Sequence, residues 1–194
     1  MERITLGRTG LTINRCGFGG IPIQRVDEGQ AVETVRHAVE QGVDFIDTSR
    51  AYTTSERRIG KALKLTDKKV ILASKSVSRT SEDVKADLEK SLSELQDDHI
   101  DLYQCHFVRT QEEYQQVIQS RGALDILVKA KEEGIIGHIG ITSHSFEILD
   151  QALNDGLFET IMVCFSFLEP AAKERIIPKA FEKNIGVIAM KSLV

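Results

Sequence analysis

Four polar residues follow short apolar runs in this sequence, and their types suit proton transfer. Asp47 ends "VDFID", Tyr52 lies five residues later, Lys75 ends "KVILASK", and His106 follows "IDLYQC". A phenol titrates near pH 10, and a neighbouring ammonium stabilises the phenolate, so Lys75 is expected to lower the pKa of Tyr52. A partly desolvated Lys75 needs a carboxylate partner, for which Asp47 is suited. His106 could orient a substrate oxygen or share the proton.

This set of side chains would deliver a proton to an oxygen on which negative charge develops, as carbonyl reduction requires. Because side chains supply no hydride, the predicted chemistry needs a nicotinamide cofactor. Each residue also has a purely structural explanation: Asp47 could cap a turn, Tyr52 could pack its ring, Lys75 could lay its stem on apolar surface, and His106 could be a hydrogen-bonded core imidazole. Their recurrence at consecutive ends of apolar runs favours the functional interpretation.

Seven short apolar runs alternate with longer amphipathic stretches, which predicts seven strands separated by helices. A hairpin is expected before them, because Ile4, Leu6, Leu11 and Ile13 alternate with polar residues around "GRTG". The predicted strands are "CGFGGI", "VDFIDT", "KVILASKS", "IDLYQCHF", "IGHIGIT", "TIMVCFSF" and "IGVIAMKS".

Helices are predicted where apolar residues recur at helical spacing, over residues 28–42, 55–64, 81–96, 121–134, 145–156 and 171–184. Their ends carry capping signals. Thr80 or Ser81 and Ser145 are expected to open helices, and Gly42, Gly134 and Gly156 to follow helix ends.

Strict alternation, with strands that are apolar on both faces, predicts an α/β protein with a parallel sheet covered by helices. Two architectures fit, an open doubly wound sheet and a closed TIM (β/α)8 barrel. The stretch "GFGGIPIQRVDEGQ" lacks the G-x-G-x-x-G pattern of an open nucleotide-binding sheet, and the leading hairpin could plug a barrel, so the barrel is favoured. A closed TIM barrel needs eight strands, each followed by a helix, in about 250 residues. We therefore expect a single domain over residues 1–194, an incomplete barrel truncated at strand seven.

Composition excludes several classes of partner. The 25 basic and 29 acidic residues are mixed, giving a net charge of −4 and no basic stripe, so nucleic acid is not an expected partner. No signal-like or membrane-length apolar run occurs, and the three cysteines are unpaired in the sequence, which predicts a cytoplasmic protein away from membranes. Neither cysteines nor histidines cluster at ligand spacing, so no metal site is expected. The sequence does not predict the oligomeric state.

Four motifs, "GVDFIDTSRAYTTSERRIG", "ILASKS", "IDLYQCHF" and "EGIIGHIGITSHS", occur in an order and spacing that resemble the aldo-keto reductase family over essentially the whole chain. The resemblance implies a catalytic tetrad of Asp47, Tyr52, Lys75 and His106. It implies an interconversion of a small aldehyde or ketone with its alcohol that depends on NADPH, with NADH left open. Tyr52 would be the general acid, Lys75 and Asp47 its tuning pair, and His106 the group that orients the substrate.

The resemblance also implies a set of cofactor contacts, at which this chain departs from the common pattern. Met162 stands where an amide is usual, Met190 where an aromatic ring often stacks, Thr53 replaces a glycine after the catalytic tyrosine, and Phe107 replaces a tryptophan after the catalytic histidine. The expected cofactor-binding residues are Gly20, Ile21, Asp47, Thr142, Ser143, Met162, Met190, Lys191 and Ser192.

Two other functions remain open from the sequence. The same fold could serve as a cofactor-binding regulatory or scaffold protein with little turnover. A cofactor-free isomerase or aldolase that uses Lys75 as a Schiff-base lysine is the second possibility, and borohydride trapping would detect it.

Overall fold

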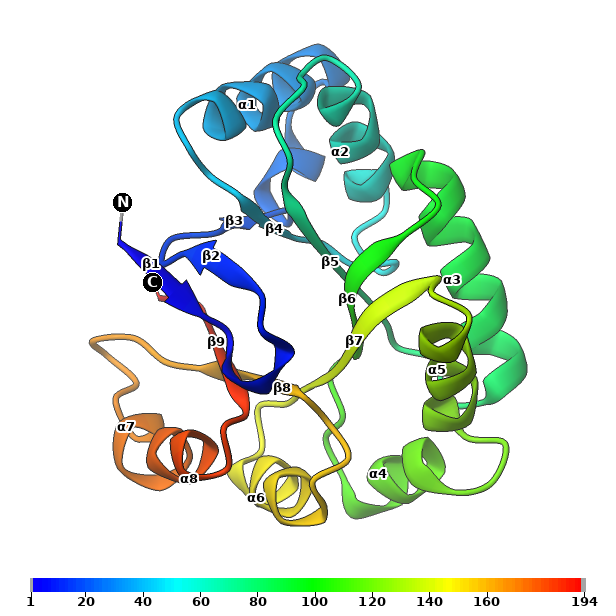
Figure 1. Ribbon diagram of the computed structural model, residues 1–194, viewed down its shortest axis with the longest axis vertical. Coiled ribbons are helices and arrows are strands. Elements are labelled where there is room, and N and C mark those ends of the chain that lie inside the picture. Colours follow the sequence, from blue (N-terminus) through cyan, green and yellow to red (C-terminus); the bar gives the residue numbers. More distant parts are fainter. Residues whose placement is uncertain (1, 193–194) are drawn as a thin grey trace.

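A computed structural model describes residues 2–192, and its centre is a seven-stranded parallel sheet that curls into an open arc (Figure 1). The strands lie side by side in chain order. This confirms the predicted α/β class and the barrel type of winding, with seven strands in place. They are β3 (Phe18–Gly19), β4 (Phe45–Asp47), β5 (Ile71–Ser76), β6 (Ile100–Cys105), β7 (Ile136–Thr142), β8 (Thr160–Cys164) and β9 (Gly186–Met190).

Helices line the outer side of the arc (Figure 1). Those that match the predictions are α1 (Glu28–Glu40), α2 (Ser55–Leu63), α3 (Ser81–Leu95), α5 (Ala123–Glu132) and α6 (Phe146–Asp155), and a short 3-10 turn, η2 (Pro22–Arg25), precedes α1. No helix within residues 2–192 is both long enough and apolar enough to cross a membrane.

The predicted capping signals are present. The hydroxyl of Thr80 accepts a hydrogen bond from the backbone of Asp83 at the start of α3, and Ser145 accepts one from Ile148 at the start of α6. Gly42, Gly134 and Gly156 have φ of 96°, 75° and 67°, the left-handed conformation that ends a helix.

Two helix predictions were wrong or incomplete. Residues 171–184 form two short helices, α7 (Ala172–Arg175) and α8 (Ile177–Glu182), because Pro178 lacks the N–H that a continuous helix needs and disfavours helical backbone before it. A further helix, α4 (Gln111–Ile118), was not predicted. Its sequence signal was present, since Thr110 is followed by Glu113 three residues later, and in the structure the Thr110 hydroxyl accepts from the backbone of Glu113 as an N-cap.

Residues of each strand alternate between two environments, because successive side chains of a strand point to opposite faces. Ile46 and Tyr103 belong to the large apolar cluster between sheet and helices. Phe45, Ala73 and Leu102 belong instead to a smaller cluster on the other face, inside the arc. Two residues further along each of these three strands come Asp47, Lys75 and Gln104, so a polar layer follows the apolar one.

A hairpin covers the inner apolar cluster (Figure 1). It consists of β1 (Arg3–Thr5), the 3-10 turn η1 (Gly7–Thr9) and β2 (Thr12–Asn14), with Ile4 opposite Ile13 as the alternation predicted. Leu6 packs against the backbone of Gly186, where a Cβ atom would meet Leu6 Cγ at 2.7 Å. Arg8 joins the hairpin to the far end of the sheet, since its backbone N–H donates to Asn184 O (2.6 Å) and its guanidinium to Gly156 O (2.7 Å).

Candidate active site

An ion pair between Asp47 and Lys75 lies in the inner polar layer. Lys75 Nζ donates to Asp47 Oδ2 (2.5 Å) and to the carbonyl oxygen of Thr48 (2.6 Å), and the Lys75 side chain is 1% exposed. Both residues lie at the carboxyl ends of neighbouring parallel strands, which brings them together. Burial raises the pKa of the Asp47 carboxyl and lowers the pKa of Lys75, while their mutual attraction opposes both shifts. The predicted pairing is therefore present.

Gln104 completes this pair and was missed in the sequence. Its Nε2 donates to Asp47 Oδ1 (3.2 Å), so the two carboxylate oxygens of Asp47 each have a donor. Gln104 is fully buried and lies opposite Lys75 in the register of β5 and β6. A signal was available, because Gln104 precedes His106 by two residues and must share its side of the strand.

Tyr52 lies over this pair, in the loop between β4 and α2. Lys75 Nζ is 5.2 Å from the centroid of the Tyr52 ring, and the His106 ring is 5.7 Å away in an edge-to-face arrangement. Tyr52 is partly buried, and its hydroxyl makes no hydrogen bond to the residues between 2 and 192, so it can bond to a ligand.

The expected pKa shift of Tyr52 is contradicted. Burial first, and the negative charge of Asp47 second, raise the pKa of the phenol above its usual value of about 10. Lys75 does not offset this, because its charge is already matched by the carboxylate that it binds. The phenol therefore keeps its proton through the neutral range, which suits a proton donor.

His106 follows β6 directly and is a neutral imidazole. Burial, and then the positive charges of Lys75, Arg79 and His144, lower the pKa of His106 to about 3. Its Nδ1 atom lies 3.0 Å from the hydroxyl oxygen of Ser49, a residue that the sequence did not single out. Its carbonyl oxygen accepts from Arg79 Nη2 (3.0 Å), which also donates to the carbonyl oxygen of Phe107 (3.1 Å).

Among the expected cofactor residues, Thr142 and Ser143 lie at the end of β7, and Met162 lies beside them in the middle of β8. Thr142 is opposite Met162 in the register, and both are buried. The Thr142 hydroxyl oxygen accepts from the backbone of Phe107 (2.8 Å) and keeps a hydrogen to donate. The Ser143 hydroxyl donates to the carbonyl oxygen of Val108 and accepts from the backbone of Ser145, so it is already engaged within the chain.

The other expected cofactor residues lie at opposite edges of the sheet. Gly20 follows β3, is buried, and its backbone bonds to Asp47 O (2.8 Å) and the Ser55 hydroxyl (2.9 Å), while Ile21 is 42% exposed. Met190, Lys191 and Ser192 are at the end of β9, on the far side of the arc. A hollow of about 420 Å³ adjoins Lys191 and is also lined by His144, Cys164 and Glu169.

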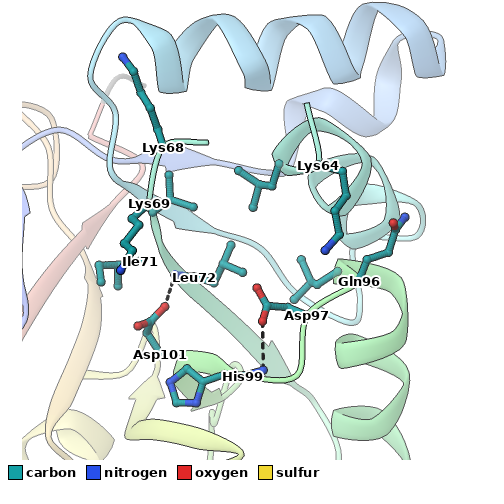
Figure 2. Close-up of a pocket in the computed structure, with 13 residues that line it drawn as sticks. Lys64, Lys68, Lys69, Ile71, Leu72, Gln96, Asp97, His99 and Asp101 are labelled. Carbon is teal, nitrogen blue, oxygen red and sulfur yellow. Dashed lines mark hydrogen bonds between the residues drawn. The ribbon is translucent and has the colours of Figure 1, made fainter. Parts of the chain in front are cut away.

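A second hollow, of about 340 Å³, lies where β5 and β6 begin, at the opposite end of these strands from the polar layer (Figure 2). Lysines surround it, including Lys64, Lys68 and Lys69. Its carboxylates bond to the chain itself, since Asp101 accepts from the backbone of Leu72 (2.8 Å) and Asp97 from that of His99 (3.2 Å). It has no contact with the four candidate catalytic residues.

Comparison with known proteins gives consistent matches. The model of the aldo/keto reductase family matches residues 4–194. L-galactose dehydrogenase from Arabidopsis thaliana is 32% identical over 100% of this chain and 66% of its own length. Aldo-keto reductase YhdN from Bacillus subtilis is 29% identical over 100% of this chain and 62% of its own length.

A solved structure is similar over nearly the whole chain. The holo form of aldo-keto reductase AKR11C1 from Bacillus halodurans has a TM-score of 0.85 and 27% identity, covering 97% of this chain and 65% of that one. The chain therefore spans 66%, 62% and 65% of the lengths of these three proteins, which is less than two thirds of each.

Proposed function

Because the chain belongs to the aldo/keto reductase family, we propose that it interconverts a small aldehyde or ketone with the corresponding alcohol, using a nicotinamide cofactor. One observation carries the proposal: a protonated, unengaged Tyr52 hydroxyl lies beside a neutral His106 and above the buried Asp47–Lys75 pair. This is the arrangement that proton delivery to a carbonyl oxygen requires.

Tyr52 is the proton donor in this scheme. As it gives its proton to the carbonyl oxygen, negative charge develops on the phenol, whose ring centroid lies 5.2 Å from Lys75 Nζ. Asp47 binds Lys75 Nζ and Gln104 binds the other carboxylate oxygen of Asp47, so the pair is held in place. In the reverse direction, Tyr52 accepts the proton of the alcohol.

The residues present fit part of a nicotinamide nucleotide. The Thr142 hydroxyl keeps a free hydrogen for a carboxamide oxygen, and Lys191 at the rim of the hollow beyond β9 suits a phosphate. Met162 and Met190 offer softer, non-hydrogen-bonding contacts. When bound, the cofactor would supply or accept the hydride. We propose NADPH as the cofactor, and NADH should be tested in parallel.

The proposal is tested by following NADPH oxidation with a panel of aldehydes and ketones, and NADP⁺ reduction with alcohols. The panel includes aldose sugars, since one similar plant protein is named L-galactose dehydrogenase. Cofactor binding is measured separately by fluorescence. Binding without turnover on any member of the panel would favour the regulatory or scaffold function.

Tyr52→Phe is expected to lower kcat by roughly 100- to 10,000-fold, because it removes the acid and keeps the ring. Cofactor affinity should stay within about twofold. Tyr103→Phe is the matched control, since Tyr103 is buried on the other face of the sheet and its hydroxyl has only a 3.5 Å contact with Ser91. A Tyr52→Phe variant with near-normal kcat would show that Tyr52 is not the proton donor.

A further inference from the structure

The residue after Tyr52 has a backbone conformation that suits glycine. Thr53 has a φ of 37°, in the left-handed region that β-branched residues rarely enter. It is the second residue of a tight turn that ends at Ser55, whose backbone N–H donates to the carbonyl oxygen of Tyr52 (2.7 Å). A positive φ at this position is typical of turns that use glycine there. A threonine in this turn therefore costs free energy that a glycine would not.

The side chain that causes this strain makes a hydrogen bond across two loops. Thr53 Oγ1 donates to Gln24 Oε1 (2.9 Å). The bond joins the loop between β4 and α2, which carries Tyr52, to η2 in the loop between β3 and α1. A glycine has no side chain with which to make it. The bond is exposed to solvent, where the freedom that two side chains lose commonly offsets much of the gain.

Both ends of this hydrogen bond are held by the fold before it forms. Arg58 of α2 donates from Nη1 to the carbonyl oxygen of Ile23 and to that of Val26 (2.9 Å for Val26). These carbonyl groups lie on either side of Gln24 in the chain, so the backbone that carries Gln24 is anchored to α2. Thr53 contributes a short side chain whose χ1 torsion is restricted by branching at Cβ. The entropy lost when the bond forms is therefore small.

We infer that Thr53 is a positioning residue, whose hydrogen bond to Gln24 fixes the turn that presents the Tyr52 phenol. The inference rests on the proposed function, in which Tyr52 gives its proton to the substrate oxygen. A proton donor must stay within hydrogen-bond reach of its acceptor, and a small displacement of a catalytic group lowers the rate steeply. A glycine would relieve the strain but free the turn to move. Threonine gives up stability and holds the phenol in place.

The hydrogen bond is tested first by a measurement that needs no turnover. Gln24→Met removes the amide and keeps the length of the side chain. Amide hydrogen exchange at Ser55 reports on the turn, because this N–H closes it. We expect exchange at Ser55 to become about three- to tenfold faster in Gln24→Met, the loss of one hydrogen bond. Gln30→Met, on an exposed position of α1, should leave this rate unchanged. Unchanged exchange in Gln24→Met would overturn the inference, whether or not the protein is a reductase.

Substitutions of Thr53 separate positioning from stability. Thr53→Val keeps the branched shape and the strain but loses the hydroxyl, whereas Thr53→Gly loses both the hydroxyl and the strain. The urea midpoint should therefore be higher for Thr53→Gly than for Thr53→Val, while kcat should fall about three- to tenfold in both. Thr53→Ser keeps the hydroxyl and should keep a near-normal kcat. A Thr53→Gly variant with the kcat of the wild type would show that Thr53 does not position Tyr52.

Gln96→Gly is the matched control for relief of a positive φ. Gln96 has a φ of 58° and follows α3, beside the hollow at the opposite end of the strands from the polar layer (Figure 2). This change should raise the urea midpoint and leave kcat within about twofold. If kcat fell as far in Gln96→Gly as in Thr53→Gly, the loss would follow from a glycine anywhere in the fold, and the inference would be overturned.

Discussion

His106 illustrates how the surroundings of one side chain decide what it can do. In water an imidazole is partly charged near neutral pH, but here burial and three nearby cationic or partly cationic side chains keep it uncharged until the pH falls to about 3. A neutral ring can take part in directional hydrogen bonding at the mouth of the site without adding positive charge beside Lys75. Its contribution to the chemistry is therefore orientation, and proton donation falls to Tyr52.

The same shift predicts how stability depends on pH. Between pH 6.5 and about 3 the unfolded chain binds a proton at His106 that the folded chain does not bind, so His106 makes the folded state less stable as pH falls through this window. His106→Gln should therefore lose stability less steeply than the wild type between pH 6.5 and 4 in urea unfolding. Equal slopes for His106→Gln and wild type would contradict the buried, neutral imidazole.

At the scale of elements, the loop between β4 and α2 is held by a buried charge network. Arg50 in the loop pairs with Glu56 in the first turn of α2, and Ser74 of β5 donates to the other oxygen of Glu56 (2.6 Å). The side chains of Arg50 and Glu56 are 11% and 1% exposed. Tyr52 lies between these two residues in the chain, so the network fixes the segment that presents the phenol.

Glu56→Ala should loosen that segment and destabilise the fold. It leaves Arg50 with only Glu94 at 3.3 Å as a charged partner, and removing one member of a buried pair costs about 3 kcal/mol. The free energy of unfolding in urea and the kcat should both fall. Glu33→Ala breaks an exposed pair with Arg36 within α1 and should change the unfolding free energy by less than about 1 kcal/mol. If the two variants had equal free energies of unfolding, the Arg50–Glu56 pair would contribute little to the stability of the fold.

Element-scale features were predictable from sequence to the extent that they depend on local periodicity. Alternating apolar residues located the strands, and so located Asp47, Lys75 and His106 at strand ends. Gln104 and Ser49 were missed because a polar residue within or just after a strand gains meaning only from its partner on another strand. The pKa direction of Tyr52 was wrong because it depends on burial and on which charge Lys75 has already neutralised. Both quantities arise from packing.

At the scale of the whole molecule, the arc is built in layers along its strands. The hairpin seals one end, an apolar layer of Phe45, Ala73 and Leu102 follows, and the polar layer with Asp47, Lys75 and Gln104 lies beyond it. The sheet is unpaired at the outer edges of β3 and β9 within residues 2–192. The hairpin therefore provides a link across the inside of an open sheet.

Leu6→Ala should weaken that link. Leu6 is 2% exposed and packs with Phe45 and the backbone of Gly186, and deleting a buried leucine costs about 2–5 kcal/mol. The urea midpoint should fall accordingly. Leu65→Ala makes the same chemical change on a residue that is 62% exposed and should leave the midpoint nearly unchanged. An equally small effect of Leu6→Ala would mean that the hairpin does not stabilise the arc.

The contact between Arg8 and Asn184 has a consequence for how the protein is made. A ribosome adds about 5–20 residues per second, so the hairpin is synthesised roughly 10–35 seconds before Asn184. During that interval the apolar side of the hairpin, with Leu6 and Ile13, lacks the last strand on which it will rest. Until then the hairpin can rest only on the earlier strands, through Phe45, Ala73 and Leu102, and its attachment to the edge of the sheet at Asn184 is among its last contacts to form during synthesis.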